Sequence, residues 1–355
     1  MKYAVGALPL LFSLVGCGAK PAAEPAPVIS AAAPAPSAAS GAASGSAAVA
    51  TEPPPKPVDS AEDKIAKARA KVDSDHQAEL ARWTPELHAS AKRLAETSYA
   101  STDAALKVLL SSPHRQPGNA ERDKFRHPRE SLEFFGVQPT SVVLEYGPGG
   151  GWYTELLAPL LAKRGKLLVT SDETNGPPSE RTVGSYRLKL LLETSPELFG
   201  KVEPVSVDVK DPKLAFDDKL DVVLVLRELH NFVNDGTVDV WLREFKHALK
   251  PHGVLAIEDH RALAGADPAQ SAKLGYLPEA WAIEKIEAAG FKLAAKSEIN
   301  ANPKDTKDYP DGVWTLPPTY RLGDKDRAKY AAIGESDRFT LRFVRNDAPA
   351  PAKKP

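Results

Sequence analysis

Cysteine is almost absent from this sequence of 355 residues, in which Cys17 is the single example. An intramolecular disulfide is therefore excluded, as are a cysteine nucleophile and a cysteine-based zinc site after residue 17. An excess of basic charge is also missing, because 46 Lys and Arg stand against 47 Asp and Glu. This balance excludes the basic field that nucleic-acid binding requires.

A membrane-spanning apolar run is missing at the N-terminus. Lys2 precedes an apolar stretch over 3–15, which Gly6, Pro9 and Ser13 interrupt. This stretch is shorter than the ~20 apolar residues that cross a bilayer, and it is typical of a signal peptide over 1–16. Its end, Leu-Val-Gly-Cys at 14–17, resembles the lipobox of bacterial lipoproteins. The resemblance implies lipidation of Cys17; the alternative is an incidental thiol in a cleaved peptide.

Gly18 follows the cysteine in place of the aspartate associated with inner-membrane retention. We therefore expect a lipid-anchored protein of the cell envelope, at the outer membrane and facing the periplasm. Residues 17–58 are mostly Ala, Pro, Ser and Gly, and 347–355 are similar in kind. Such segments bury too little surface to offset their ordering entropy, which predicts a disordered tether and a disordered tail.

Residues 59–140 read as a helical N-terminal extension. Ser60 and Asp63 match a capping box, and Thr84 followed by Pro85 is a second helix start. The stretch 64–71 is polar on most faces, which predicts a solvated stalk instead of a packed helix. His114 to Pro128 reads as a basic loop.

From residue 141 strands and helices alternate, which indicates an α/β domain over 141–346 with helices on both faces of a mostly parallel sheet. The pattern predicts seven strands, at 141–146, 166–171, 202–207, 221–226, 254–258, 291–299 and 339–345. Helices are expected at 153–163, around 187–193, around 238–249 and at 278–289. A turn is expected at 251–253. A long insertion, 300–338, separates the last two strands.

The first of these strands runs into a glycine-rich turn, Glu-Tyr-Gly-Pro-Gly-Gly-Gly at 145–151. A dinucleotide fingerprint needs a third small residue where this chain has Trp152 or Thr154, and no Gly-Lys-Ser/Thr of a P-loop follows. The spacing E-x-G-x-G-x-G resembles motif I of the class I S-adenosylmethionine-dependent methyltransferases. The alternative is a turn that only links strand to helix.

That resemblance implies the Rossmann-like class I methyltransferase fold, with S-adenosylmethionine as cofactor. It places Glu145, Gly147, Gly149 and Gly151 beside the methionine moiety. Asp172 follows Gly151 by 21 residues, near the distance at which an acidic residue meets a ribose, and by the resemblance it or Glu173 would hold the ribose. Asp208, after the third strand, would meet the adenine amino group. Both aspartates can equally be ordinary turn or loop carboxylates.

Histidines after the fourth and fifth strands are the candidate catalytic residues. His230 and His260 can serve as general bases if the acceptor must lose a proton; the alternative is structural hydrogen bonding. Four arginines are candidates for binding an anionic acceptor, although they can equally pair with nearby carboxylates: Arg227, Arg261, Arg126 and Arg338. Trp314 lies in the insertion, which is either a lid over the acceptor or a structural loop. No two histidines have a compact ligand spacing, so we expect no metal site.

Longer sequence motifs extend the resemblance over about residues 91–345. These motifs are Phe134–Val137, Glu228–Asn231, Glu258–Arg261 and the Gly-Val-Trp-Thr-Leu-Pro-Pro block at 312–318. Together they are similar to a group of bacterial proteins described as predicted methyltransferases that carry export signals. The resemblance implies methyl transfer but no firm acceptor, which we expect to be a small molecule or a cell-envelope component. The alternative is a lipid-anchored binding protein that uses the same fold without chemistry. The sequence does not indicate an oligomeric state.

Overall fold

The structure is a computed structural model that describes residues 60–171 and 179–347. Several predictions concern residues outside these ranges: the lipidation site Cys17, the ribose candidate Asp172, the disordered tether over 17–58 and the disordered tail after Asp347. Within the described ranges, no helix has the length and apolar character needed to cross a bilayer.

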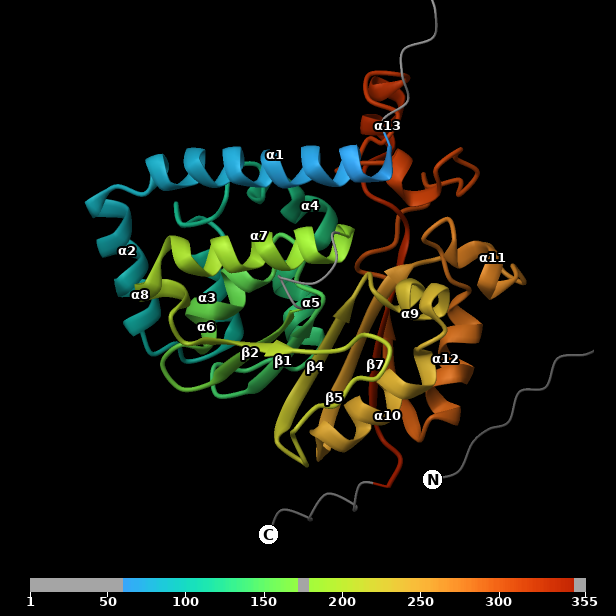
Figure 1. Ribbon diagram of the computed structural model, residues 1–355. Helices are drawn as coiled ribbons and strands as arrows, with labels where there is room; N and C mark the ends of the chain where they lie inside the picture. Colours follow the sequence, from blue (N-terminus) through green and yellow to red (C-terminus); the bar gives the residue numbers. More distant parts are fainter. Residues whose placement is uncertain (1–59, 172–178, 348–355) are drawn as a thin grey trace, which may run out of the picture. The chain divides into compact units, whose positions relative to one another are not determined.

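A seven-stranded sheet forms the centre of the fold (Figure 1). Its strands, in spatial order, are β3 (Val202–Ser206), β2 (Lys166–Ser171), β1 (Val142–Tyr146), β4 (Leu220–Leu226), β5 (Leu249–His260), β7 (Arg338–Arg345) and β6 (Phe291–Ser297). Only β7 runs against its neighbours, pairing antiparallel with both β5 and β6. The order changes direction beside β1, so the carboxyl ends of β1 and β4 border the crevice where ligands of such sheets bind.

The central strands are continuous apolar runs because both of their faces are covered. Val143 of β1 and Leu224 of β4 face one core, while Leu144 and Val223 face the other. This confirms the predicted mostly parallel sheet with helices on both faces. The strand positions agree to within one or two residues, except at β5.

Strand β5 is longer than predicted because no separate turn forms at 251–253. The chain stays in the sheet from Leu249, with an irregular register opposite Leu220 and Val222. A Cβ on Gly253 would lie 2.9 Å from the Leu220 carbonyl oxygen. Glycine therefore allows the close backbone approach that keeps this irregular segment paired. The predicted turn at 251–253 is wrong for this reason.

Helices cover each face of the sheet. On one side are α2 (Pro85–Glu96), α3 (Thr102–Leu109), α5 (Pro128–Phe134), α6 (Thr154–Leu161), α7 (Glu180–Thr194) and α8 (Pro196–Phe199). On the other are α9 (Leu229–Asp235), α10 (Val238–Ala248), α11 (Pro268–Ala272) and α12 (Glu279–Ala288). The predicted N-cap Thr84 and the glycine that follows α12, Gly290 with φ +92°, are both present. Helix α7 is longer than predicted and begins at a Ser179 capping box.

The first described helix, α1 (Ala61–Arg82), lies along α7 (Figure 1). Its capping box at Ser60 and Asp63 is confirmed. The predicted solvated stalk is wrong in part, because Arg69 lies over the ring of Tyr186 on α7, 3.2 Å from its centroid. Tyr186 also donates a 2.7 Å hydrogen bond to Asp73. These polar contacts follow no apolar stripe, so periodicity did not indicate them.

Short elements complete the part of the chain near the sheet's carboxyl edge. They are η1 (Ala120–Arg122), α4 (Asp123–Arg126), η2 (Gly312–Thr315) and α13 (Arg327–Ile333). The first two lie within 114–128, which we predicted to be a loop, so that prediction is wrong in part. The last two lie in the segment between β6 and β7, where small clusters form around Val313 and around Leu316.

Candidate functional site

The glycine turn after β1 has the backbone conformation that its composition requires. Gly147, Gly149 and Gly151 all have positive φ, from +56° to +78°, a region that side chains disfavour. A Cβ on Gly147 would lie 2.8 Å from Glu228 Cδ, and one on Gly151 would lie 2.1 Å from Leu191 Cδ2 of α7. A Cβ on Gly149 would meet nothing within 4 Å. Gly147 and Gly151 therefore allow close packing, whereas Gly149 faces open space.

Two cavities adjoin this turn, and a third adjoins the first of them. The central cavity, of about 530 Å³, is bounded by the turn, α1, α7 and the arginines of the η1–α4 segment. The β2-side cavity, about 130 Å³, lies between the turn, Thr170, Val207 and α7. The histidine cavity, about 330 Å³, is lined by His230, His260, Trp314 and residues near them.

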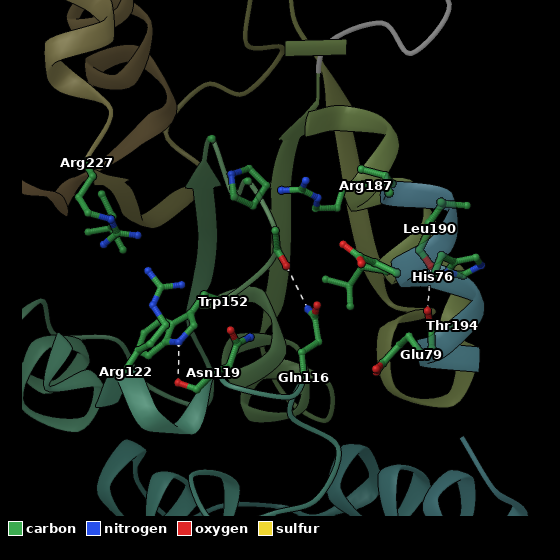
Figure 2. A pocket seen from close by; sticks show the side chains of 18 of the residues that line it. His76, Glu79, Gln116, Asn119, Arg122, Trp152, Arg187, Leu190, Thr194 and Arg227 are labelled. Carbon is green, nitrogen blue, oxygen red and sulfur yellow. Dashed lines mark hydrogen bonds between the residues drawn. The ribbon is translucent and has the colours of Figure 1, made fainter. Parts of the chain in front are cut away.

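Figure 2 shows the central cavity, with Arg122 and Arg227 on one side and Arg187, Leu190 and His76 on the other. Gln116 lies between them and donates a 3.0 Å hydrogen bond to the Gly150 carbonyl. The loop before η1 therefore braces the glycine turn from the side opposite the sheet.

Glu228, at the end of β4, lines all three cavities. Burial raises the pKa of its carboxyl group, although a 2.9 Å hydrogen bond from Asn231 Nδ2 favours the charged form. The central cavity shares the glycine turn with the β2-side cavity and three arginines with the histidine cavity, so the three adjoin one another, and we call them together the trench. Glu228 stands where its parts meet.

His230 and Asp259 form a buried pair at the far end of the trench. Both His230 Nδ1 and the His230 backbone N–H lie 2.9 Å from carboxylate oxygens of Asp259. Burial alone would lower the pKa of His230, but the charge and hydrogen bond of Asp259 raise that pKa above 6.5. With Nδ1 bound to Asp259, Nε2 is the ring nitrogen left for the histidine cavity. This arrangement suits a general base whose tautomer is set by a carboxylate.

His260 has the opposite electrostatic environment. Its ring centroid lies 5.6 Å from that of His230, and Nδ1 bonds Ser336 Oγ. Burial, then the charges of His230 and of Arg338, lower its pKa well below 6.5. His260 is therefore a neutral ring that can donate or accept a hydrogen bond, whereas His230 is the stronger base.

The fold brings His230, Asp259 and His260 together, with candidate ligand atoms within 4.8 Å of one another. Sequence spacing concealed this group, because two strand ends supply it. The Asp259 carboxylate already accepts hydrogen bonds from His230 Nδ1 and from the backbone N–H groups of His230 and His260. Those bonds hold Asp259 as a positioning residue for the histidine.

The other predicted residues divide between the trench and its surroundings. Arg227 lines the central and histidine cavities, and its φ of +64° is rare for a residue with a side chain. Trp314 lines the histidine cavity, so part of the insertion forms its wall. Arg261 instead pairs with Glu279, Glu298 and Asp337, and it lines none of the three cavities.

Two predicted cofactor contacts have local partners. Glu145 is buried and accepts a 2.7 Å hydrogen bond from Thr154 Oγ1, and burial raises its pKa to about 7. Asp208 is exposed, and its Oδ1 accepts a 2.9 Å bond from the Lys210 N–H. Neither lines the three cavities, so their contacts with a cofactor stay predictions. So does that of Asp172.

Sequence reasoning did not select several residues of the trench. Arg126 is among the predicted anion-binding residues, whereas Arg122 is not, although the two are four apart, a spacing that places both on one helical face. Glu228 belongs to one of the sequence motifs of the resemblance, which assigns it no role. His76 and Glu79 of α1 line the central cavity, and nothing in a polar helix without an apolar stripe indicates that.

The sheet order, with its single antiparallel strand and a ligand trench at the carboxyl ends of β1 and β4, defines a Rossmann-like class I methyltransferase fold. No protein-family model matches the sequence, and no curated protein matches it either.

Solved structures resemble the chain at low identity. A SAM-dependent methyltransferase from Aquifex aeolicus is 18% identical over 65% of this chain and 94% of its own, with a TM-score of 0.42. The cyclase SpnF is also 18% identical, over 62% and 80%, with a TM-score of 0.41. The glycopeptide N-methyltransferase MtfA, in complex with S-adenosyl-L-homocysteine, is 12% identical over 61% and 86%, at 0.39. Function has to be argued from the site of this chain itself.

Proposed function

We propose that the protein transfers a methyl group from S-adenosylmethionine to a small acceptor. One observation carries this proposal: the glycine turn, the end of β4 and His230, which Asp259 positions, line adjoining cavities at one edge of the sheet. The trench offers a site for a nucleoside-type cofactor at one end and a base at the other. A turn that only linked strand to helix would need no such cavities.

The residues present fit the proposed cofactor. The open side of Gly149 admits a ligand to the main chain where a Cβ would intrude. The β2-side cavity, next to the end of the strand that precedes Asp172, is where the adenosine moiety would lie. Glu228 offers a carboxylate for the cationic methionine moiety, and Gln116 keeps the turn in place through Gly150.

When bound, S-adenosylmethionine would supply an activated methyl group, to which an acceptor lone pair would bond as the C–S electron pair returned to sulfur. The chain's own residues must then align the acceptor and remove its proton. His230 Nε2 accepts that proton, while Asp259 holds Nδ1 and stabilises the imidazolium that forms. Trp314 lines the same cavity and forms part of the wall against which the acceptor would lie.

Titration calorimetry of the full chain with S-adenosylhomocysteine tests the cofactor assignment. We expect saturable heat, and we expect methyl transfer from isotopically labelled S-adenosylmethionine to a component of a cell-envelope extract. Absence of heat at millimolar ligand would overturn the proposal. Binding without transfer to any fraction would instead favour a binding protein that performs no methylation.

We also propose that the chain is anchored in the cell envelope through lipidated Cys17, with the outer membrane favoured. The proposal is supported by the apolar segment before the cysteine and by the Leu-Val-Gly-Cys end of that segment. We expect Cys17→Ser to move the protein from the membrane fraction to the soluble fraction of expressing bacteria.

The readouts for Cys17→Ser are fractionation and the mass of the mature N-terminal peptide. The variant must still bind S-adenosylhomocysteine as the unchanged chain does, which separates a lost anchor from a lost fold. Retention of the variant in membranes, or an unmodified Cys17 in the parent, would refute lipidation.

A further inference from the structure

Four guanidinium groups gather between the central and histidine cavities. Arg122, Arg126 and Arg338 all pair with Glu335, and Arg227 and Arg338 pair with Glu258. Four positive charges thus share two carboxylates. Counting Glu228 as ionised still leaves one positive charge unbalanced. Structural ion-pair networks in protein interiors need close to full compensation, because an unpaired buried charge is costly.

The excess charge faces the trench. Arg122, Arg126 and Arg227 line both the central and the histidine cavity, whereas Arg338 is 1% exposed and lies behind them. Arg227 reaches this position from a left-handed backbone, with φ of +64°. Strained backbone of this kind persists where the surroundings hold a side chain in a required place.

The guanidinium groups of the network keep unused donors. Within 60–171 and 179–347, the hydrogen bonds of the Arg122 side chain run from Nε to Glu335 alone, at 2.8 Å. Over the same ranges Arg227 uses Nη1, which donates to Glu258 at 3.1 Å. Since each guanidinium has five N–H donors in a planar fork, both side chains can still bind a planar or tetrahedral anion.

The pKa values of neighbouring groups indicate the same positive potential. Burial and then the charge of Arg227 lower the pKa of Arg126 to about 9, with Glu335 offsetting this only in part. The charges of Arg338, Arg227 and Arg126 also act against protonation of His260. A positive potential beside Arg126 and His260 favours an anion there.

We propose that the methyl acceptor is anionic, with a carboxylate or phosphate group held by Arg122 and Arg227 and its nucleophile directed toward His230. This inference rests on the proposed function, because it assigns an acceptor class to the same trench. The arginines join the cofactor part to the histidine part, so an anion bound there places the rest of the molecule between turn and base.

The competing interpretation is that these arginines bind the carboxylate of the cofactor's own methionine moiety. The two interpretations differ in one measurable way. An acceptor anion binds together with the cofactor product, whereas an anion at the cofactor's carboxylate site is displaced by it.

Inorganic phosphate and acetate serve as probes, titrated calorimetrically into the full chain with and without saturating S-adenosylhomocysteine. We expect at least one of them to bind in the presence of S-adenosylhomocysteine. Arg122→Gln should weaken that binding by about 10- to 100-fold, the loss expected for a charge-assisted contact. Arg122→Lys, which keeps the charge but not the fork, should restore part of it. Arg93→Gln, at an exposed position on α2, is the matched control and should change nothing.

The outcomes separate this inference from the proposed function. S-adenosylhomocysteine binding without binding of either anion, or competition between them, would overturn the anionic acceptor and leave the cofactor assignment standing. Anion binding without S-adenosylhomocysteine binding would overturn the cofactor assignment, and with it the role of the anion as a methyl acceptor, while the anion site itself would stand. Arg122→Gln leaves Glu335 paired with Arg126 and Arg338, and an unchanged melting temperature of that variant verifies the fold. Undiminished anion binding in Arg122→Gln would also refute the inference.

Discussion

His230→Asn is expected to lower the rate of methyl transfer by about 10²- to 10⁴-fold, the contribution typical of a general base. The affinity for S-adenosylhomocysteine should stay unchanged, because His230 lines the histidine cavity and neither of the other two. Asparagine keeps a polar group beside Asp259, so the buried carboxylate is not left without a donor. Single-turnover rates with labelled donor and calorimetry separate the two effects.

The pH dependence gives this prediction a second readout. A general base must be neutral, so activity should rise with pH through the pKa of His230, which Asp259 raises above 6.5. In Asp259→Asn the burial of the ring and the charge of Arg227 remain, and both lower that pKa. The midpoint should therefore move downward. Imidazole NMR titration follows the same shift without any acceptor.

A matched control for His230 is His252→Asn, at an exposed position of β5 away from the cavities. It should alter neither rate nor midpoint. Equal losses in His252→Asn and His230→Asn would point to a general effect on the fold. Full activity in His230→Asn would remove the base from the mechanism.

Gly149→Arg is expected to abolish binding of S-adenosylhomocysteine, with a loss of at least about 100-fold in affinity. The side chain would project into the open space beside the turn, where the structure places no atom within 4 Å of a Cβ. Arginine at φ +56° also carries backbone strain, on the order of 1–3 kcal/mol. Calorimetry measures the first effect and thermal unfolding the second.

Gly265→Arg isolates the contribution of strain. Gly265 has φ +75°, its Cβ would also meet nothing within 4 Å, and it follows β5 outside the three cavities. We expect a comparable loss of stability in both variants but unchanged binding in Gly265→Arg. If Gly149→Arg bound S-adenosylhomocysteine normally, the turn would not be the cofactor site.

Local sequence patterns predicted the sheet well because the features that determine it are local in the sequence. Strands with two covered faces are unbroken apolar runs, and the glycines at 147–151 indicate a turn whose backbone needs positive φ. The Thr84 and Ser60 caps are likewise local. The error at β5 has the same origin, since Pro251 and Gly253 carry a turn signal that a close backbone approach to Leu220 overrides.

The site was predictable only where single strand ends supplied it. His230 and Asp259 lie 29 residues apart and meet through the pairing of β4 with β5, which no spacing reveals. Arg261 and Arg227 both follow a strand in the sequence, yet Arg261 pairs with three carboxylates, whereas Arg227 lines a cavity. The choice depends on which neighbours the fold supplies, and that is information about tertiary contacts.

Helix α1 forms one wall of the central cavity while burying a single side chain, Val72. Complete burial of a valine contributes on the order of 1.5–3 kcal/mol, little for a helix of 22 residues. Local opening of this helix therefore costs far less free energy than unfolding of the sheet. An element with little apolar burial thus borders the central cavity. Occupancy of the trench would reduce the exchange of its amide hydrogens, making α1 a natural reporter of whether the cavity is filled.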